Sequence, residues 1–421
     1  MKRKNLRILV VSQYFWPENF RINDLVLGLQ ERGNQITVLT GVPNYPGGRL
    51  FPGYGYFNKL RDNFNGVDVF RAPLIPRGVG DGTRLALNFF SFAACASILG
   101  PLICMGKFDV VLVYEPSPIS VAIPGIVLKI SKSAPLMFWM QDLWPQSLSA
   151  TGAVRSRAIL KMVEMMVRLI YLGCDRILAQ SRAFCQSIID LGGKSECIYY
   201  YPNSAESLYR PIDIENDAPE RIQMPDGFRI TFAGNIGAAQ DFETILSAAE
   251  ELKDFKDIHL VVLGDGRKFP WVQEQVRRRG LEHTVHLLGR HPAEKMPRYF
   301  ALSDALLVTL RKEPIFALTI PSKIQSYLAC ARPIIAALDG EGARIIDESE
   351  AGISCPAENP RALADAILKL YRMTEADREN IGQNGKKYFD ENFEREMLLD
   401  RLEEWMQEMV AHGNTKSIRS C

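Results

Sequence analysis

The sequence lacks an excess of charge of either sign. It contains 50 Lys and Arg against 49 Asp and Glu, and charged residues make up 24% of the chain. A protein that coats a nucleic acid carries a clear positive surplus, and an acidic disordered protein carries the opposite. The balance argues against both classes, and we expect no nucleic-acid partner.

Paired cysteines and N-terminal histidines are also missing. The eight cysteines are scattered, with no C-x-x-C pair and no zinc-finger spacing. This pattern predicts no disulfide framework and favours a reducing, cytoplasmic compartment. All five histidines lie at position 259 or later, so chemistry in the N-terminal half is expected to run without imidazole. The basic N-terminus leads into only a short apolar run, and no secretion signal is predicted.

The first half of the chain shows the pattern of a parallel sheet covered by helices. Short β-branched runs alternate there with amphipathic stretches, and 421 residues with 47% apolar content suffice for two or three domains. Helices are expected at 24–32 and 84–105. Strands are expected at 7–12, 35–40, 67–71, 110–114, 136–140, 176–179 and 197–200.

A second set of strands follows a polar, proline-containing stretch that has no apolar periodicity. The strands are expected at 229–232, 259–263, 285–288, 305–310 and 333–337. We therefore predict an α/β protein of two Rossmann-like, doubly wound domains that face each other across a cleft. The N-terminal domain spans 1–203, the linker 204–227 and the C-terminal domain 228–390, and 391–421 forms a helix that crosses back to the first domain.

Glycine turns at strand ends are the clearest ligand signal in the second half. Residues 230–237 are read as a strand and a turn through Gly234 and Gly237, with a helix expected over 238–252. A second turn holds Gly264 and Gly266. Backbone N–H groups at such strand exits suit a phosphate, although each turn is also compatible with an ordinary strand-to-helix connection.

A predicted helix at 321–330 adds a cation near these turns. Pro321 fits its first turn, Ser322 could satisfy free N–H groups there, and Lys323 would place a positive charge beside the helix N-terminus. The alternative is a plain capped helix with a solvated lysine. Arg290, Arg311 and Lys312 would add charge or lie on the surface.

The order of motifs along the chain resembles that of family-four glycosyltransferases of the GT-B fold. The motifs are YFWPE with NDL, QDLWPQS, DRILAQS, YPNS, FAGNIG, LGDG, LGR, SDALLV and IPSKIQSYLACARP. The resemblance is strongest to the bacterial O-antigen and capsule branch that includes N-acetyl-L-fucosamine transferases.

The resemblance implies transfer of a sugar from a nucleotide diphosphate donor with retention of anomeric configuration and without a required metal or other cofactor. UDP is the nucleotide we favour. It also implies that the donor binds mainly to the C-terminal domain. The acceptor, a lipid-linked precursor of a bacterial surface polysaccharide, would bind mainly to the N-terminal domain, on the cytoplasmic side of the inner membrane.

Two departures from the family pattern affect the donor side. Asn235 and Gln240 stand where many members carry an arginine and a lysine that neutralise the diphosphate. Lys323, with Arg290 or Arg311, is the expected replacement, because burying a diphosphate without a cation would cost several kcal/mol.

The second departure concerns a pair of glutamates that bind the sugar and ribose in many members. Leu318 and Ser326 occupy those two positions here. Glu313, nearby, is the acidic residue expected to contact the sugar, and the start of the helix with Pro321 is expected to take over the rest of this role.

On the acceptor side, the loop after the first strand lacks the glycine pair of the family and carries Glu18, Asn19 and Arg21, candidates for contacts to phosphate or acceptor. Asp142 stands at about the place where many relatives have a histidine. It is expected to orient the acceptor hydroxyl or receive its proton, or else to cap the next helix. Without a convincing carboxylate nucleophile, a front-face mechanism is favoured over double displacement.

Two apolar stretches raise the question of membrane contact. Residues 85–105 are long enough to span a bilayer, but polar residues interrupt them and a strand follows closely, so a core or interfacial helix is favoured. Residues 155–172 place charges on one stripe and apolar residues on a wide face. That helix could rest on anionic lipid or pack on the sheet.

Other functions are compatible with the same two-domain frame. An epimerase or phosphorylase shares it, although a phosphorylase would need a cofactor lysine and a longer chain. A noncatalytic nucleotide-sugar-binding or scaffold subunit is the alternative from another class, because the usual cation and glutamate pairs are missing.

Overall fold

The computed structural model describes residues 4–78, 82–150, 154 and 156–418, without the side chains of 150 and 413–418. By the clustering of its contacts the chain forms two compact units. Unit 1 comprises residues 1–202 and 396–421, and unit 2 comprises residues 203–395. Residues 204–227, expected as a linker, are therefore part of unit 2 and contain the short helix α7 (Pro219–Gln223).

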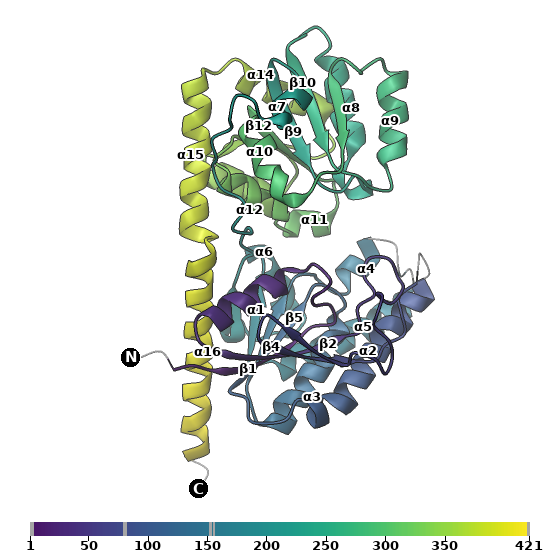
Figure 1. Cartoon of the computed structure of the whole chain (residues 1–421), viewed down its shortest axis with the longest axis vertical. Coiled ribbons are helices and arrows are strands. Elements are labelled where there is room, and N and C mark those ends of the chain that lie inside the picture. Colours follow the sequence, from purple (N-terminus) through teal and green to yellow (C-terminus); the bar gives the residue numbers. More distant parts are fainter. Residues whose placement is uncertain (1–3, 79–81, 151–153, 155, 419–421) are drawn as a thin grey trace. The chain divides into compact units, whose positions relative to one another are not determined.

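Unit 1 is built on an eight-stranded sheet in the order β3-β4-β2-β1-β5-β6-β7-β8 (Figure 1). All neighbouring strands are parallel except the pair β3 and β4. The strands are β1 (Arg7–Val11), β2 (Gln35–Gly41), β3 (Arg61–Phe64), β4 (Val67–Ala72), β5 (Val110–Glu115), β6 (Leu136–Met140), β7 (Arg176–Ala179) and β8 (Ile198–Tyr200).

Helices cover both faces of this sheet. On one face α1 packs with alternate residues such as Val38 and Leu112 in one core cluster. On the other face, glycines let α2 and α3 approach Leu39 and Val113 closely. The helices of this part are α1 (Arg21–Glu31), α2 (Gly82–Ile103), α3 (Ala122–Lys132), α4 (Gln146–Ala150), α5 (Arg157–Gly173) and α6 (Arg182–Asp190).

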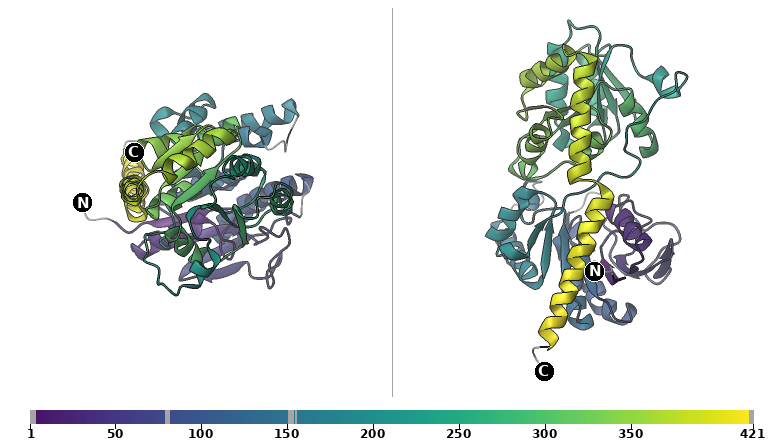
Figure 2. Two further views of the ribbon diagram at one scale, coloured as in Figure 1. Left: turned by 90° about the horizontal axis from the view of Figure 1, so that it is seen from above. Right: turned by 90° about the vertical axis from the view of Figure 1, so that its left-hand side faces the viewer.

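The C-terminal helix α16 (Arg395–Ile418) belongs almost entirely to unit 1. Its residues Leu398, Leu402 and Met406 are buried in the same core cluster as α1 and the central strands. Arg32, which follows α1, forms ion pairs with three of its carboxylates. Figure 2 shows α16 in yellow along the strands of unit 1.

Unit 2 is a smaller, fully parallel sheet in the order β11-β10-β9-β12-β13-β14. Its strands are β9 (Phe228–Ala233), β10 (Ile258–Leu263), β11 (Val285–Gly289), β12 (Ala305–Thr309), β13 (Ile334–Ala337) and β14 (Gly352–Cys355). Besides α7, its helices are α8 (Phe242–Glu251), α9 (Phe269–Arg278), α10 (Met296–Ala301), α11 (Pro314–Leu318), α12 (Ser322–Ala329), α13 (Glu341–Glu348), α14 (Pro360–Tyr371) and α15 (Glu375–Asn392).

The prediction of two doubly wound α/β domains is confirmed. Both sheets have their first strand in the interior, and the chain builds outward from it in both directions. The sequence analysis missed β3 and β14, and it placed the start of α8 too early. The helix expected from Ala238 begins at Phe242, because residues 238–240 form a short 3-10 turn and Asp241 is left-handed.

Candidate functional site

In unit 2 the direction of chain connection reverses between β9 and β12. The chain runs from β9 outward to β10 and β11, and then returns to the other side of β9 through β12. Ligands of open α/β sheets bind in the crevice outside the carboxyl ends of the strands at such a point. The glycine turns predicted from the sequence lie at this end of the sheet.

Backbone hydrogen bonds join the turns that follow β9, β10 and β11. The Gly234 N–H donates to the Leu263 carbonyl over 2.8 Å, and the Gly264 N–H donates to the Gly289 carbonyl over 2.7 Å. The Ile236 N–H donates to the Asp265 carbonyl over 2.8 Å. These bonds hold three strand exits in one layer at the carboxyl end of the sheet.

Two of these glycines cannot carry a side chain. Gly264 has φ +152°, and a Cβ there would lie 1.9 Å from the Gly234 carbonyl oxygen. At Gly266, a Cβ would lie 2.4 Å from the Ile236 carbonyl oxygen. The close approach of the two loops therefore explains why glycine is needed.

The side chain of Lys323, in α12, lies against the turn at Gly234. A Cβ on Gly234 would lie 2.7 Å from its Cε and 3.1 Å from its Nζ. The Nζ lies 3.4 Å from the centre of the Phe232 ring and has no hydrogen-bond partner in the described part of the chain. Burial lowers the pKa of Lys323 to about 7.

The geometry at Lys323 is what an anion site requires. A buried ammonium without a hydrogen bond is costly. An anion bound at the turn would supply the missing hydrogen-bond partner and raise the pKa of Lys323 again. Lys323 is thus the predicted cation that the structure places against Gly234.

Asn235 and Gln240, which replace the usual cation pair, have other tasks in this loop. Asn235 is exposed next to Gly234, and a Cβ on Gly237 would lie 2.6 Å from its Nδ2. The Gln240 side chain accepts a hydrogen bond from the Gly237 N–H over 3.2 Å. Both amides therefore shape the turn.

The start of α12 differs in detail from the prediction. Pro321 is the N-cap residue and therefore lies just before the first turn of α12, not within it as predicted. Ser322, expected to cap the helix, is its exposed first residue and makes no capping hydrogen bond. Ser326 is buried, and its hydroxyl donates to the Ser322 carbonyl.

The remaining charged candidates of unit 2 are exposed. Arg290 directly follows β11, and Arg311 follows β12 and lies 3.6 Å from Glu358. Glu313 is the N-cap of α11, and its side chain makes no capping bond. All three lie on loops at the carboxyl ends of strands, but only Lys323 has its charged atom buried against the glycine turn.

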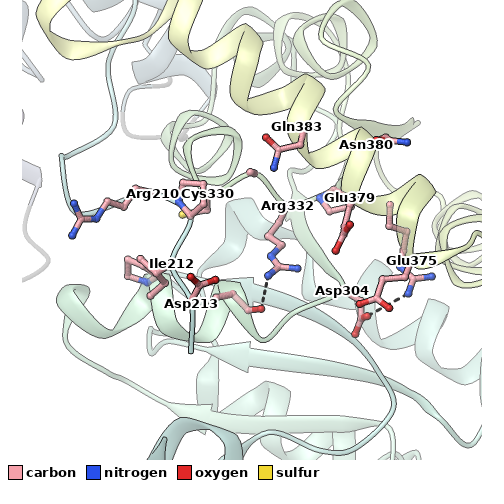
Figure 3. Close-up of a pocket in the computed structure, with 16 residues that line it drawn as sticks. Arg210, Ile212, Asp213, Asp304, Cys330, Arg332, Glu375, Glu379, Asn380 and Gln383 are labelled. Atoms are coloured by element: carbon pink, nitrogen blue, oxygen red, sulfur yellow. Dashed lines mark hydrogen bonds and ion pairs between the residues drawn. The ribbon is translucent and has the colours of Figure 1, made fainter. Parts of the chain in front are cut away.

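A hollow in unit 2 lies at the amino ends of its strands, opposite the glycine turns. It has a volume of about 500 Å³ and is lined by residues that precede β12 and β13, including Asp304 and Arg332 (Figure 3). Asp304 pairs with Arg378, and Arg332 donates to the Ala301 carbonyl. Its lining includes none of the residues of the glycine turns.

Unit 1 has its own reversal point, between β1 and β5. Glu115 is the last residue of β5 and is fully buried. Neither of its carboxyl oxygens makes a hydrogen bond of normal geometry with the described residues. Burial, followed by the charge of Asp142, raises its pKa well above the usual value. The sequence analysis missed Glu115, although an acidic residue ending an apolar strand was a usable signal.

Asp142 lies two residues beyond β6, the neighbour of β5. Its Oδ1 accepts hydrogen bonds from the Leu143 N–H, over 3.0 Å, and from the Ser147 hydroxyl. Burial raises its pKa. The contact to Ser147 of α4 agrees with a local capping role, while the coupling to Glu115 makes a carboxyl pair that can hold a proton.

The three candidates in the loop after β1 fall in different surroundings. Glu18 is buried, and its Oε1 accepts from the Asn44 and Tyr45 N–H groups at 2.7 and 2.6 Å. Its pKa is raised to about 7 by burial. Asn19 is exposed, and Arg21, half-buried, begins α1. Glu18 is thus engaged in fixing the following loop.

Among the described residues, no group of three or more His, Cys, Asp or Glu side chains is placed to hold a metal ion.

Comparisons with known proteins find a family match in unit 2 and relatives that align with a larger part of the chain. Residues 227–373 match the family described as Glycosyl transferases group 1. WbjE of Pseudomonas aeruginosa, named as a glycosyltransferase, is 29% identical over 62% of this chain and 66% of its own length, slightly under two thirds. WcaI of Escherichia coli, a glycosyl transferase named for colanic acid biosynthesis, is 24% identical over 77% of this chain and 81% of its own length.

Solved structures show the same fold at low sequence identity. Anabaena HepE in complex with UDP has a TM-score of 0.68 at 14% identity, covering 96% of this chain and 100% of HepE. Sucrose-phosphate synthase from Thermosynechococcus elongatus has a TM-score of 0.74 at 15% identity, covering 97% and 100%. The chain therefore has the GT-B fold, and residues 227–373 of unit 2 match the Glycosyl transferases group 1 family.

Proposed function

We propose that this chain transfers a sugar from a nucleotide diphosphate donor to a lipid-linked precursor of a bacterial surface polysaccharide, with retention of configuration and without a bound metal. The observation that carries the proposal is Lys323, whose buried Nζ lacks a hydrogen-bond partner among the described residues and lies against the glycine turn at Gly234. The match of residues 227–373 to the Glycosyl transferases group 1 family supports the reaction class, and the buried amine beside the glycine turn supports the proposed position of the diphosphate.

The donor diphosphate would lie over the turns at Gly234 and Gly264. Lys323 would neutralise one of its charges, and Arg290 is the candidate for a second cation. UDP is the proposed nucleotide, supported by the HepE structures in complex with UDP and UDP-glucose. Glu313, at the start of α11, and Ser326, inside α12, are proposed to lie near the sugar and the ribose.

In the transfer step, the acceptor hydroxyl oxygen would form a bond to the anomeric carbon while the bond from that carbon to the diphosphate breaks. The hydroxyl proton would pass to the leaving diphosphate on the same face of the sugar. Lys323 would stabilise the negative charge that develops on the leaving group. Asp142, with its raised pKa beside Glu115, would orient the hydroxyl.

The identity of the substrates rests on the resemblance and the relatives. WcaI is named for colanic acid biosynthesis, and colanic acid is a bacterial surface polysaccharide. We accordingly place the acceptor among lipid-linked saccharide precursors at the cytoplasmic face of the inner membrane. N-acetyl-L-fucosamine is the proposed donor sugar.

A thermal-shift screen of UDP, GDP, CDP and ADP tests the donor site. A diphosphate present at 100 times its Kd stabilises the native state by about 2.7 kcal/mol, and we expect UDP to give the largest shift. Lys323→Ala should abolish the shift, and Lys369→Ala, at an exposed lysine of α14, should leave it unchanged. An unchanged shift in Lys323→Ala would disprove this placement of the diphosphate.

Turnover of UDP-sugars separates catalysis from binding. Asp142→Asn should keep the UDP shift and reduce turnover by about 10²-fold or more. A wild-type chain that binds UDP but transfers no sugar to any lipid-linked acceptor would instead favour a noncatalytic, nucleotide-sugar-binding scaffold subunit.

A further inference from the structure

Large apolar side chains are exposed almost exclusively in unit 1. Of the 17 large hydrophobic residues that are exposed in the described part of the chain, 16 lie in unit 1 and only Ile222 lies in unit 2. Ten of the 17 are on α2, α3 and α5, and Met105 directly follows α2. Single exposed apolar residues are normal, but a concentration of this size marks a binding surface.

Helix α2 carries one continuous apolar stripe on its outer side. The stripe contains Leu87, Phe90, Ile98 and Leu102, with exposed fractions between 48% and 68%. The helix is the one candidate in the described residues that is long and apolar enough to cross a membrane, although only by length and composition. It lies along the sheet and buries its other side, including Asn88, which is hydrogen-bonded to Gln13. We therefore treat it as a packed helix with an exposed apolar side.

Helix α5 has a second stripe, at the spacing of one helix face. Its members are Ile159, Met162, Met165, Leu169 and Leu172, with exposed fractions of 45–65%. Val167, Ile170 and Tyr171 are the residues that α5 buries. Packing on the sheet therefore accounts for only part of the apolar surface that the sequence predicts for this helix.

Helix α3 connects the two stripes into one surface. The Lys132 Nζ donates to the Pro101 carbonyl of α2 over 3.0 Å, and the Lys129 Nζ donates to the Gly173 carbonyl of α5 over 2.9 Å. Ile130, between these lysines, is 73% exposed. The three helices lie together on one side of the sheet in Figure 1. We call the exposed side of α2, α3 and α5 the apolar face.

The charges around the apolar face are nearly all positive. The three helices contain six basic residues, namely Arg84, Lys129, Lys132, Arg157, Lys161 and Arg168, and a single acidic one, Glu164. Glu164 pairs with Arg168, and Lys129 pairs with Asp175. On α5 the basic residues form a stripe along one edge of the apolar side chains. An apolar strip bordered by Lys and Arg is the pattern of a helix that lies in the interface of an anionic bilayer.

We propose that the apolar face is a docking surface for an anionic lipid bilayer, with α2 and α5 lying in the plane of the interface. The alternative occupant, a second copy of the chain, is disfavoured by charge. In a two-fold symmetric dimer the same surface would face itself, and six basic residues against one acidic residue would repel. Anionic headgroups instead provide the complementary charge. The proposal goes beyond the transfer reaction and does not depend on which sugar or acceptor is used.

Vesicle co-sedimentation of the full chain tests this surface without any turnover. The probes are vesicles of phosphatidylcholine alone and vesicles of an equal mixture of phosphatidylcholine and phosphatidylglycerol. We expect binding to the mixed vesicles that weakens as salt is raised. The double variant Met165→Glu, Leu169→Glu should lower the partition coefficient by about tenfold or more, and Arg157→Glu, Lys161→Glu should do the same.

Matched controls lie in unit 2. Ile222→Glu alters an apolar residue that is 86% exposed, and Arg278→Glu alters an arginine whose side chain is 69% exposed. Both should bind vesicles like the wild type, and circular dichroism should show every variant folded. Equal binding to both vesicle types, or unchanged binding of the two double variants, would overturn the proposal. So would a dimer that these variants dissociate in light scattering while vesicle binding stays constant.

Discussion

At the scale of single residues, Lys323 combines a stability cost with the binding role that we propose for it. Its folded-state pKa of about 7 lies below the ordinary lysine value of 10.5, and burial is the cause, with no contribution from a charged neighbour. A pKa lowered on folding means that the unfolded chain binds more protons than the folded chain between these two values. Burial of the charged Lys323 amine therefore lowers the free energy of unfolding.

The first prediction concerns the pH dependence of stability without nucleotide. The penalty for burying Lys323 should be complete below about pH 7 and should fade as the pH rises toward 10.5. Lys323→Met should raise the free energy of unfolding by a few kcal/mol near pH 6.5, at about 1.4 kcal/mol per unit of pKa difference. The gain should shrink by about pH 9.5. Urea denaturation at both pH values measures it.

Lys323→Met also tests the pH dependence of UDP binding. UDP affinity of the wild type should fall as the pH rises above about 7, because the anion needs the protonated amine. In Lys323→Met the affinity should be weaker and nearly independent of pH. Lys369→Met, on the exposed surface of α14, should behave as the wild type in both measurements. A stability gain that persists unchanged at high pH would show that the charge of Lys323 is not its cause.

The site residues differ in how far the sequence could reveal them. The placement of the glycines at strand ends and of Lys323 at a helix start could be predicted, because the apolar runs mark the strands and Pro321 marks the start of the helix. For Glu115 the sequence offered only the signal of an acidic residue at the end of an apolar strand, because its raised pKa comes from burial and from Asp142, which lies 27 positions later. Likewise, the role of Glu18 in holding Asn44 depends on a loop that carries no periodic pattern.

At the scale of elements, the contact between two glycine turns decides the shape of the donor region. Gly264→Ala would place a Cβ 1.9 Å from the Gly234 carbonyl oxygen, which belongs to backbone and cannot rotate away. We predict that this variant loses at least about 3 kcal/mol of stability and binds UDP at least about tenfold more weakly. Denaturant unfolding and calorimetric titration measure the two effects.

Gly280 provides the matched control for this substitution. It also has positive φ, +60°, but an added Cβ there meets no atom within 4 Å. Gly280→Ala should therefore cost only about 1–2 kcal/mol, the price of the left-handed backbone, and should leave UDP binding intact. Equal losses in the two variants would mean that backbone conformation, and not the contact between loops, makes glycine necessary at 264.

Elements with a clear apolar pattern were predicted close to their observed bounds. Elements without such a pattern were missed or misplaced. The sequence placed β6 and β7 at their observed bounds because each is a short, buried apolar run. It missed β3, because RDNF has no apolar alternation and lies at the edge of the sheet, where it pairs only with β4. It also extended α8 through Asp241, whose left-handed backbone no propensity rule indicates.

At the scale of the whole molecule, the chain completes unit 1 only with its last helix. Leu398, Leu402 and Met406 of α16 are buried among residues of β1, β5 and α1. Arg176 adds an ion pair to Glu408. Unit 2, in contrast, draws its residues from one continuous stretch, 203–395. Folding of unit 1 therefore has to wait for the end of the chain, whereas unit 2 does not.

The last prediction follows from this division. Leu402→Ala removes a fully buried side chain from the core of unit 1 and should cost about 2–5 kcal/mol. Glu404→Ala, at an exposed position of the same helix, should change the stability by less than about 0.5 kcal/mol. Because the proposed donor residues lie in unit 2, the stabilisation by UDP should be equal in both variants. A separate fragment of residues 203–395 should also bind UDP, and its failure to bind while folded would show that the donor site needs residues from unit 1.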